Sequence, residues 1–344
     1  MATNFLNLWI LARVAQAAVF TCLCLAGAVL GQRLVRRWQA GQSSEQQLAL
    51  ERQAELVASV MQVALILGVL GLGLSVLVSD HLVGGIRGAM CAFGVLASTR
   101  SGFYGLLASG LTAAACGLWV VLHRFDLRLR TPVLTRRKFA WLLPVGALAL
   151  GDLALVVTFA WQLDFKVIAS CCSVWVDAAV VHNSPMVQLL APVPAGLLGA
   201  GAAAAAAIAA AVVVRRPGPA AVWVASGLSA AGPVAVLPAV LGVVAPHALG
   251  TPTHLCPFCL FHLQGGGLGW PLFGSLFLGS VTGMGLGVVE LNRKAAGDPA
   301  AVAAFMKVLG RWSAAGWLGL LLCGAVPVVR YWLQSGGVSV FGKV

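Results

Sequence analysis

The sequence is poor in charged residues. Only 9% of its 344 residues are charged, whereas 60% are hydrophobic, and the mean hydropathy is +0.94. Soluble globular proteins carry about 25% charged residues, so this composition excludes that class and indicates a protein of the lipid bilayer. Tyr is also scarce, with 2 residues against 11 Trp. The long apolar stretches lack the alternation of transmembrane strands, which excludes a barrel.

Eight apolar stretches are long enough to cross a bilayer, because each crossing needs about 20 residues. The sequence therefore predicts an all-α polytopic membrane protein, with residues 1–344 forming a single integral membrane domain and a bundle of about eight transmembrane helices. The predicted spans are about 5–31, 56–79, 103–123, 141–162, 193–214, 219–246, 270–290 and 312–333. Asp298 and Pro299 also predict the start of a separate short helix over 295–311 at the inner membrane surface.

The distribution of Lys and Arg predicts the orientation, since short cytoplasmic loops retain positive charge. Sixteen of the 22 Lys and Arg residues lie in the odd-numbered loops: Arg33, Arg36, Arg37, Arg52, Arg124, Arg128, Arg130, Arg136, Arg137, Lys138, Arg215, Arg216, Arg293, Lys294, Lys307 and Arg311. We therefore expect an inner (plasma) membrane protein of bacterial type, with both termini and the even-numbered loops outside. The net charge of +12 then reflects topology and contact with the lipid bilayer, and no nucleic-acid partner is expected.

Cysteine and histidine gather in the loops predicted to lie outside. Five of the nine cysteines lie in the even-numbered loops, namely Cys91, Cys171, Cys172, Cys256 and Cys259. Five of the six histidines lie in the same loops or at their edges: His81, His182, His247, His254 and His262. The orientation was assigned from Lys and Arg alone, so this clustering is independent of it. Soft metal ligands and thiols are thus predicted on the extracytoplasmic face.

The densest group of such residues is the segment HLCPFCLFH, which runs from His254 to His262. Cys256 and Cys259 can chelate one metal ion or close a small disulfide ring, and the flanking imidazoles offer two further ligands. The Cys-Pro-x-Cys form resembles the redox centres of thioredoxin-like oxidoreductases, although no βαβ pattern surrounds it. Metal binding, redox exchange and a purely structural disulfide all remain open for this segment.

The other two outer loops add further soft ligands. The fourth loop contains Cys171, Cys172 and His182, and adjacent cysteines rarely form a relaxed disulfide with each other. The glycine-rich second loop contains Met90 and Cys91 and is expected to be a re-entrant segment packed against protein. Met and Cys favour Cu(I) over harder ions. The predicted metal ligands are Cys256, Cys259, His254, His262, Cys171, Cys172, Cys91, His182 and Met90.

Two functions of different classes fit these residues. In the first, the outer loops bind, relay or export a soft metal ion, with Cu(I) favoured over Zn. The surplus of His and Met favours this function, because disulfide exchange needs neither. In the second, the protein is a thiol–disulfide oxidoreductase in which the pair Cys256 and Cys259 exchanges with Cys171 or Cys172 and passes electrons to a quinone. A third alternative is a non-catalytic membrane subunit of a larger complex. We expect an extracytoplasmic or membrane protein partner, and the sequence leaves open whether the protein is an enzyme.

Small residues and one acid stand out within the spans. Gly279, Gly283 and Gly287 are spaced by four, and the run 202–211 is rich in alanine, so both predict close helix packing in lipid. Asp152 lies within the fourth span, where an ionisable side chain is a functional candidate. It could carry a proton, coordinate a cation or bond a neighbouring Ser or Thr.

The charge distribution generates a test of topology. Reporter fusions should place Gln264 outside the membrane and Arg137 inside, because the loop of Arg137 is among the basic ones. An inside location for Gln264 would contradict the assignment of the thiols to the extracytoplasmic face.

Overall fold

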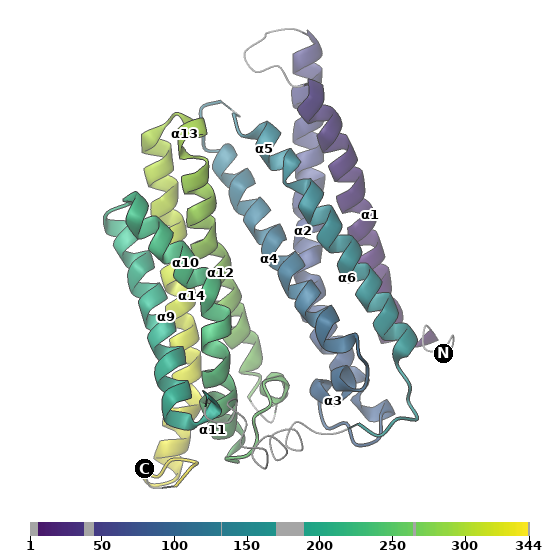
Figure 1. Cartoon of the computed structure of the whole chain (residues 1–344), viewed down its shortest axis with the longest axis vertical. Helices are drawn as coiled ribbons and strands as arrows, with labels where there is room; N and C mark the ends of the chain where they lie inside the picture. The colour runs from purple at the N-terminus through teal and green to yellow at the C-terminus, as the bar shows by residue number, and fades with distance from the viewer. Residues whose placement is uncertain (1–5, 38–44, 132, 170–188, 264–265, 343–344) are drawn as a thin grey trace. The chain divides into compact units, whose positions relative to one another are not determined.

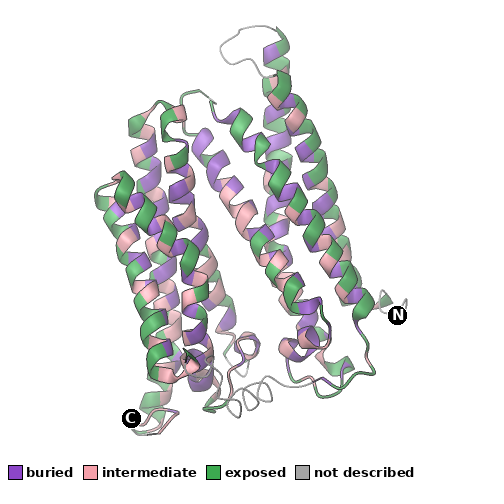
Figure 2. Cartoon of the chain, in the orientation of Figure 1, coloured by how far each residue is buried: buried purple, intermediate pink, exposed green. Residues whose placement is uncertain are grey.

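The computed structural model describes residues 6–37, 45–131, 133–169, 189–263 and 266–342 (Figure 1). These residues form helices and contain no strand, and eight of the helices are long and apolar enough to cross a membrane. The prediction of an all-α polytopic membrane protein is therefore confirmed. Many exposed side chains on the long helices are large and apolar, such as Leu107, Ile208 and Leu322 (Figure 2). Such exposure is typical of helix surfaces that face lipid.

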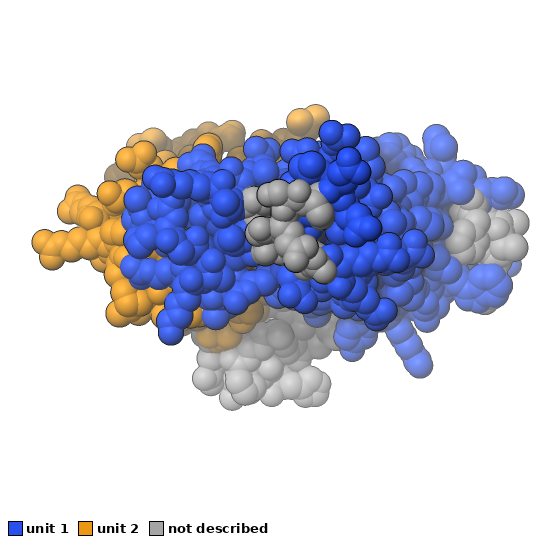
Figure 3. Space-filling view, turned by 90° about the horizontal axis from the view of Figure 1, so that it is seen from above, with its two compact units in different colours: residues 1–87, 95–169, 291–305 blue, residues 88–94, 170–290, 306–344 orange. Residues whose placement is uncertain are grey.

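The chain divides into two compact units, which Figure 3 shows in different colours. The first unit comprises residues 1–87, 95–169 and 291–305, and the second comprises residues 88–94, 170–290 and 306–344.

The first unit is built on four long helices: α1 (Leu8–Arg37), α2 (Glu45–His81), α4 (Gly102–Asp126) and α6 (Leu142–Gln162). Helix α1 packs against α2 and α6, and α4 packs against the same two helices (Figure 1). The shorter elements are η2 (Val83–Gly85), α3 (Ala92–Ala97), α5 (Thr135–Ala140) and α13 (Arg293–Ala296). Large buried side chains, including Phe20, Met61 and Trp119, form the core of this unit.

Inside this bundle, Asp152 forms an ion pair with Arg13 of α1. The Nη2 atom of Arg13 lies 2.8 Å from Asp152 Oδ2. Both side chains are buried, with exposed fractions of 5% for Arg13 and 6% for Asp152. Arg13 also donates hydrogen bonds to Ser75 (2.8 Å), Gln16 (2.6 Å) and Ser109 (2.9 Å). A lone charge inside a membrane bundle is costly, and this network compensates both charges. The sequence named bonding to a Ser or Thr as one role of Asp152, and Ser109 does donate to its carboxylate, but the sequence did not identify Arg13.

The second unit contains the remaining four long helices, α9 (Pro192–Arg215), α10 (Pro219–Ala239), α12 (Gly269–Leu291) and most of α14 (Pro299–Gln334). Its short elements are the π-helical turn η3 (Val240–Val244), α11 (Ala245–Leu249) and the 3₁₀ turn η4 (Phe258–Phe261). Helices α9 and α10 pack against each other.

Small residues allow the helices of this unit to approach closely. Gly283 lies directly against Ser229 and Ser313, and Gly279 lies against the backbone and ring of Trp317. A Cβ atom at Gly283 would overlap the Ser229 side chain, so a larger residue there would push the helices apart. In the alanine run, the buried positions are Ala203, Ala206, Ala207 and Ala210. The glycine and alanine stripes therefore lie at packed faces, as the spacing predicted.

The sixth span changes its helical geometry near its end. Pro233 and Pro238 lie inside α10, and the chain then continues as the π turn η3, in which the Ala245 N–H bonds to the Val240 carbonyl. Pro246 follows immediately and has no N–H to donate, which favours this wider turn. The ring Nδ1 of His247 lies 2.7 Å from the carbonyl oxygen of Val243 and completes the hydrogen bonding of the turn.

Helix α14 differs from its prediction. Asp298 accepts a hydrogen bond from the Ala301 N–H (3.0 Å), which confirms a helix start at this point. The helix then continues without a break to Gln334, so the expectation of a separate short helix over 295–311 is wrong. The residues after Pro299 are rich in alanine, the best helix former, and no proline interrupts the helix before Pro327.

The buried ion pair generates a stability prediction. Asp152→Asn should lower the free energy of unfolding by about 3–5 kcal/mol, because it leaves the Arg13 charge buried without its counter-ion. The double variant Arg13→Met/Asp152→Leu removes both charges and should recover most of this loss. Thermal or denaturant unfolding in detergent measures both effects, and an Asp152→Asn protein as stable as the wild type would contradict the structural role of the pair.

Candidate metal centre

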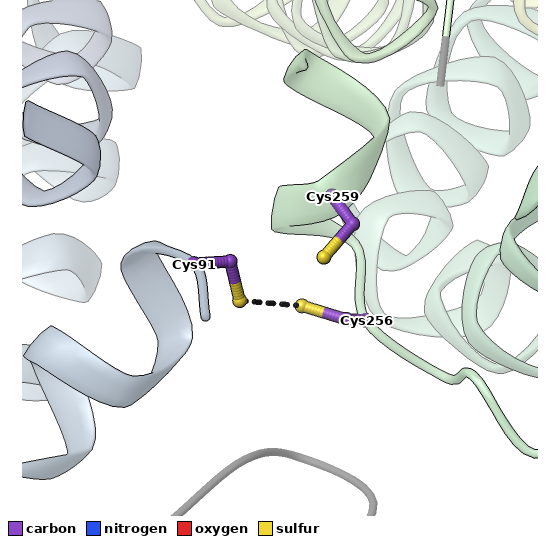
Figure 4. A group of neighbouring side chains, drawn as sticks. All are labelled: Cys91, Cys256 and Cys259. Carbon is purple, nitrogen blue, oxygen red and sulfur yellow. Dashed lines mark hydrogen bonds between the residues drawn. The ribbon is translucent and has the colours of Figure 1, made fainter. Parts of the chain in front are cut away.

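Three cysteines from two segments of the second unit come together. Cys91 precedes α3, and Cys256 and Cys259 lie between α11 and α12. Their Sγ atoms all lie within 4.8 Å of one another, and those of Cys91 and Cys256 are 3.3 Å apart. Figure 4 shows the three side chains directed toward a common point. Residues 165 positions apart in the chain thus share one small cluster of sulfur atoms.

The local turn explains why Cys256 and Cys259 point the same way. Pro257 has a φ of −71°, and the Leu260 N–H donates to the Pro257 carbonyl (3.3 Å) at the start of the 3₁₀ turn η4. Cys259 lies within this turn, and Cys256 lies directly before its N-cap residue Pro257. The chain thus bends at Pro257 and brings the Sγ atoms of Cys256 and Cys259 within 4.8 Å of each other.

Buried apolar residues hold this turn in place. Leu260 is fully buried in the core of the second unit, and the ring of Phe261 packs against Trp270 and Phe273 of α12, with ring centroids 4.8 and 5.4 Å apart. Gly269 allows this packing, because a Cβ atom there would come within 2.8 Å of the Phe261 ring. Leu260 and Phe261 thus anchor the turn that carries Cys259.

Cys91 reaches the cluster from a loop that turns at Gly88, whose φ of 80° favours glycine. The S–H groups of Cys256 and then Cys259 donate hydrogen bonds to the Cys91 sulfur and lower its pKa from 9.0 to about 3, although burial opposes this shift. The backbone N–H groups of Phe93 and Gly94 also donate to this sulfur. The cluster therefore stabilises one thiolate. The sequence did not predict these backbone donors, and the glycine-rich loop was the only signal for them.

The cluster is largely shielded from solvent. Cys91 and Cys256 are buried, at 2% and 0% exposure, and Cys259 is half-buried. No disulfide joins any of the seven cysteines that the structure describes. Cys259 is therefore the thiol of the cluster that an ion or a reactant meets first.

The function must be inferred from this geometry. No family model, curated protein or solved structure matches the chain. Because the three Sγ atoms lie within 4.8 Å of one another, one position between them is no more than about 2.8 Å from each sulfur. Thiolate–metal bonds are about 2.3 Å long. A shift of about half an ångström per sulfur would therefore bring all three into bonding distance of one ion.

The remaining predicted ligands differ in their placement. Among the described residues, His254 and His262 are not part of the group whose ligand atoms lie within 4.8 Å of one another. Both are half-buried, and the buried Nε2 of His254 has no hydrogen-bond partner in the described part of the chain. Met90 is 73% exposed. The predicted ligands of the fourth loop, Cys171, Cys172 and His182, lie outside the described residues.

The cause of the Cys91 shift can be tested in metal-free protein. Cys256→Ala removes the largest donor and should raise the pKa of Cys91 from about 3 toward 9.0, whereas Cys323→Ala, outside the cluster, should leave it unchanged. Thiolate absorbance near 240 nm during a pH titration measures this shift.

The same shift predicts a pH dependence of stability. Because the pKa is lower in the folded protein, the thiolate contributes its full stabilisation above pH 9 and loses it progressively as the pH falls toward 3. Cys256→Ala should flatten this dependence. An unchanged titration and an unchanged stability profile in that variant would contradict the proposed hydrogen bonds.

Proposed function

We propose that the protein binds one soft metal ion, with Cu(I) favoured, through the sulfur atoms of Cys91, Cys256 and Cys259. The observation that carries this proposal is the mutual approach of the three Sγ atoms to within 4.8 Å. Metal–sulfur bonds of about 2.3 Å place the sulfurs of a trigonal or tetrahedral site about 3.8–4.0 Å apart. This spacing lies between the 3.3 Å contact of Cys91 with Cys256 and the outer limit of the group.

The ligand set favours Cu(I) over zinc. Within the described residues, the group contains three sulfurs and no imidazole or carboxylate. Soft thiolates select Cu(I), which three sulfurs can satisfy, whereas structural zinc sites almost always have four protein ligands. A fourth ligand from His254 or from the fourth loop would shift this preference toward zinc.

The exposure of the three thiols supports relay or export of the ion rather than permanent retention. The half-buried Cys259 offers an exchange position, while Cys91 and Cys256 hold the ion from within. Together with the charge distribution, this suggests that an extracytoplasmic or membrane protein partner exchanges the ion at the outer face.

Thiol–disulfide exchange is a second candidate, supported by the 3.3 Å approach of Cys91 to Cys256 and by the low pKa of Cys91. In this reaction the Cys91 thiolate attacks Cys256 of a Cys256–Cys259 disulfide. A Cys91–Cys256 bond forms, the Cys256–Cys259 bond breaks, and Cys259 leaves as the thiolate. This exchange is redox-neutral. Oxidation of the reduced pair Cys256 and Cys259 to a disulfide releases two electrons and two protons, and a quinone acceptor takes up both and becomes a quinol.

Metal analysis of protein purified anaerobically in detergent tests the main proposal. After titration with Cu(I) we expect one ion per chain, because the three thiols converge on one point. Single substitutions of Cys91, Cys256 or Cys259 by Ser should each weaken Cu(I) binding at least tenfold. Cys22→Ser and Cys323→Ser serve as matched controls and should bind normally, since both cysteines lie outside the cluster.

A double histidine variant and the Cys259→Ser variant separate metal binding from thiol–disulfide exchange. Replacing His254 and His262 by Ala should leave the count of reduced thiols unchanged, and it should weaken metal binding only if an imidazole completes the site. Protein that takes up no metal, yet shows a reversible Cys256–Cys259 disulfide and a trapped mixed disulfide in Cys259→Ser, would replace the metal proposal with the oxidoreductase.

A further inference from the structure

The first unit contains a cavity that shares no residue with the cysteine cluster. It lies among α1, α2, α4 and α6 and is small: its inner part has a volume of about 40 Å³, and about 450 Å³ of empty space is reached only when the open mouth is included. Apolar side chains form most of its wall, among them Val14, Leu106, Leu155 and Phe159. The polar residues that line it are Arg13, Ser75 and Ser79. The cavity is thus apolar except at the buried ion-pair network.

The polar end retains hydrogen-bonding capacity. A guanidinium group has five N–H donors. In Arg13, Nε donates to Ser75, Nη1 donates once to Gln16, and Nη2 donates to Ser109 and to Asp152. One N–H of Nη1 therefore has no acceptor among the described residues. Ser79 donates to the Ser75 carbonyl (2.9 Å) and keeps its oxygen as an acceptor.

The positive charge of Arg13 at the polar end of the cavity is already balanced. Asp152 lies 2.8 Å from Arg13 and neutralises it, so an anionic ligand would bring an uncompensated charge into the membrane interior. A neutral acceptor can take the remaining Arg13 N–H without that cost. The network therefore selects an uncharged hydrogen-bond acceptor rather than a carboxylate or a phosphate.

The depth of the cavity indicates that the ligand comes from the bilayer. At 1.5 Å per residue, Arg13 lies about 8 Å inside the start of α1, and Ser75 lies about 9 Å inside the end of α2. Apolar walls at this depth accept a molecule that dissolves in lipid. The narrow space favours a flat group over a bulky one.

We infer that this cavity binds the neutral carbonyl group of a lipid-soluble molecule of the quinone class, with the carbonyl oxygen inside the cavity accepting from Arg13 and the ring in the open mouth between the apolar walls. An ester carbonyl of a membrane lipid offers the same acceptor chemistry from a second source. This inference rests on residues of the first unit alone and stands apart from the metal proposal.

Two glycines of α4 provide a matched test. Gly105 lines the cavity, and a Cβ atom there would contact only Leu155 at 3.8 Å, so Gly105→Val fills the space without striking the backbone. Gly110 lies on the same helix, does not line the cavity, and has open space where its Cβ would be. Gly110→Val therefore makes the same substitution in α4 but does not fill the cavity.

The experiment measures binding of a radiolabelled decyl-substituted benzoquinone to the protein in lipid nanodiscs, with empty nanodiscs as the partition control. We expect saturable binding to the wild type, at least tenfold weaker binding to Gly105→Val, and binding within twofold of the wild type for Gly110→Val. Gly105→Ala provides a milder variant with an intermediate effect, should the valine protein fail to fold.

Competition then distinguishes the two sources of the carbonyl. Displacement of the benzoquinone by an isoprenoid quinone but not by a diacylglycerol supports the quinone, whereas equal displacement by the diacylglycerol assigns the cavity to lipid esters and overturns the quinone assignment. Wild-type binding no greater than partition into empty nanodiscs, or equal binding by Gly105→Val, would overturn the inference as a whole.

Discussion

The interior of a bilayer offers no water to solvate a charge, and it gives helices no hydrophobic reason to associate with one another. Both effects are visible in this protein. Asp152 and Arg13 are buried together and surrounded by hydroxyl and amide groups, because neither could remain charged alone. Helices of the second unit meet at Gly279 and Gly283, where backbone atoms come close enough for dispersion forces to hold them.

The same constraint explains the construction of the cysteine cluster. Irregular backbone is tolerated in such a protein only where its polar groups find partners. The turn after Cys256 bonds internally through Leu260 and Pro257, and the backbone after Cys91 donates to the thiolate itself. Aromatic packing around Phe261 then fixes the turn on α12. Three thiols are thereby held in place before any ion or reactant arrives, which reduces the entropic cost of binding.

Metal binding and disulfide exchange draw on the same feature of the cluster. Both need a thiolate at neutral pH with further thiols within reach, and hydrogen bonds from Cys256 and Cys259 to Cys91 supply this arrangement. The two reactions differ in what the neighbouring sulfurs do next, since a metal ion keeps all three as ligands whereas exchange consumes them in pairs. The candidate functions therefore diverge in chemistry rather than in architecture.

Hydropathy and charge are local properties of the chain, so the sequence alone determined the all-α membrane fold and named Cys91, Cys256 and Cys259 as candidates for one site. It also predicted the helix start at Asp298 but not the unbroken length of α14, because a helix continues through any stretch whose propensity and packing allow it. Only the tertiary structure decided that Cys91 meets Cys256 and that Arg13 is the partner of Asp152. These pairs are separated by 165 and 139 residues, and such contacts depend on how helices pack, which no local pattern encodes.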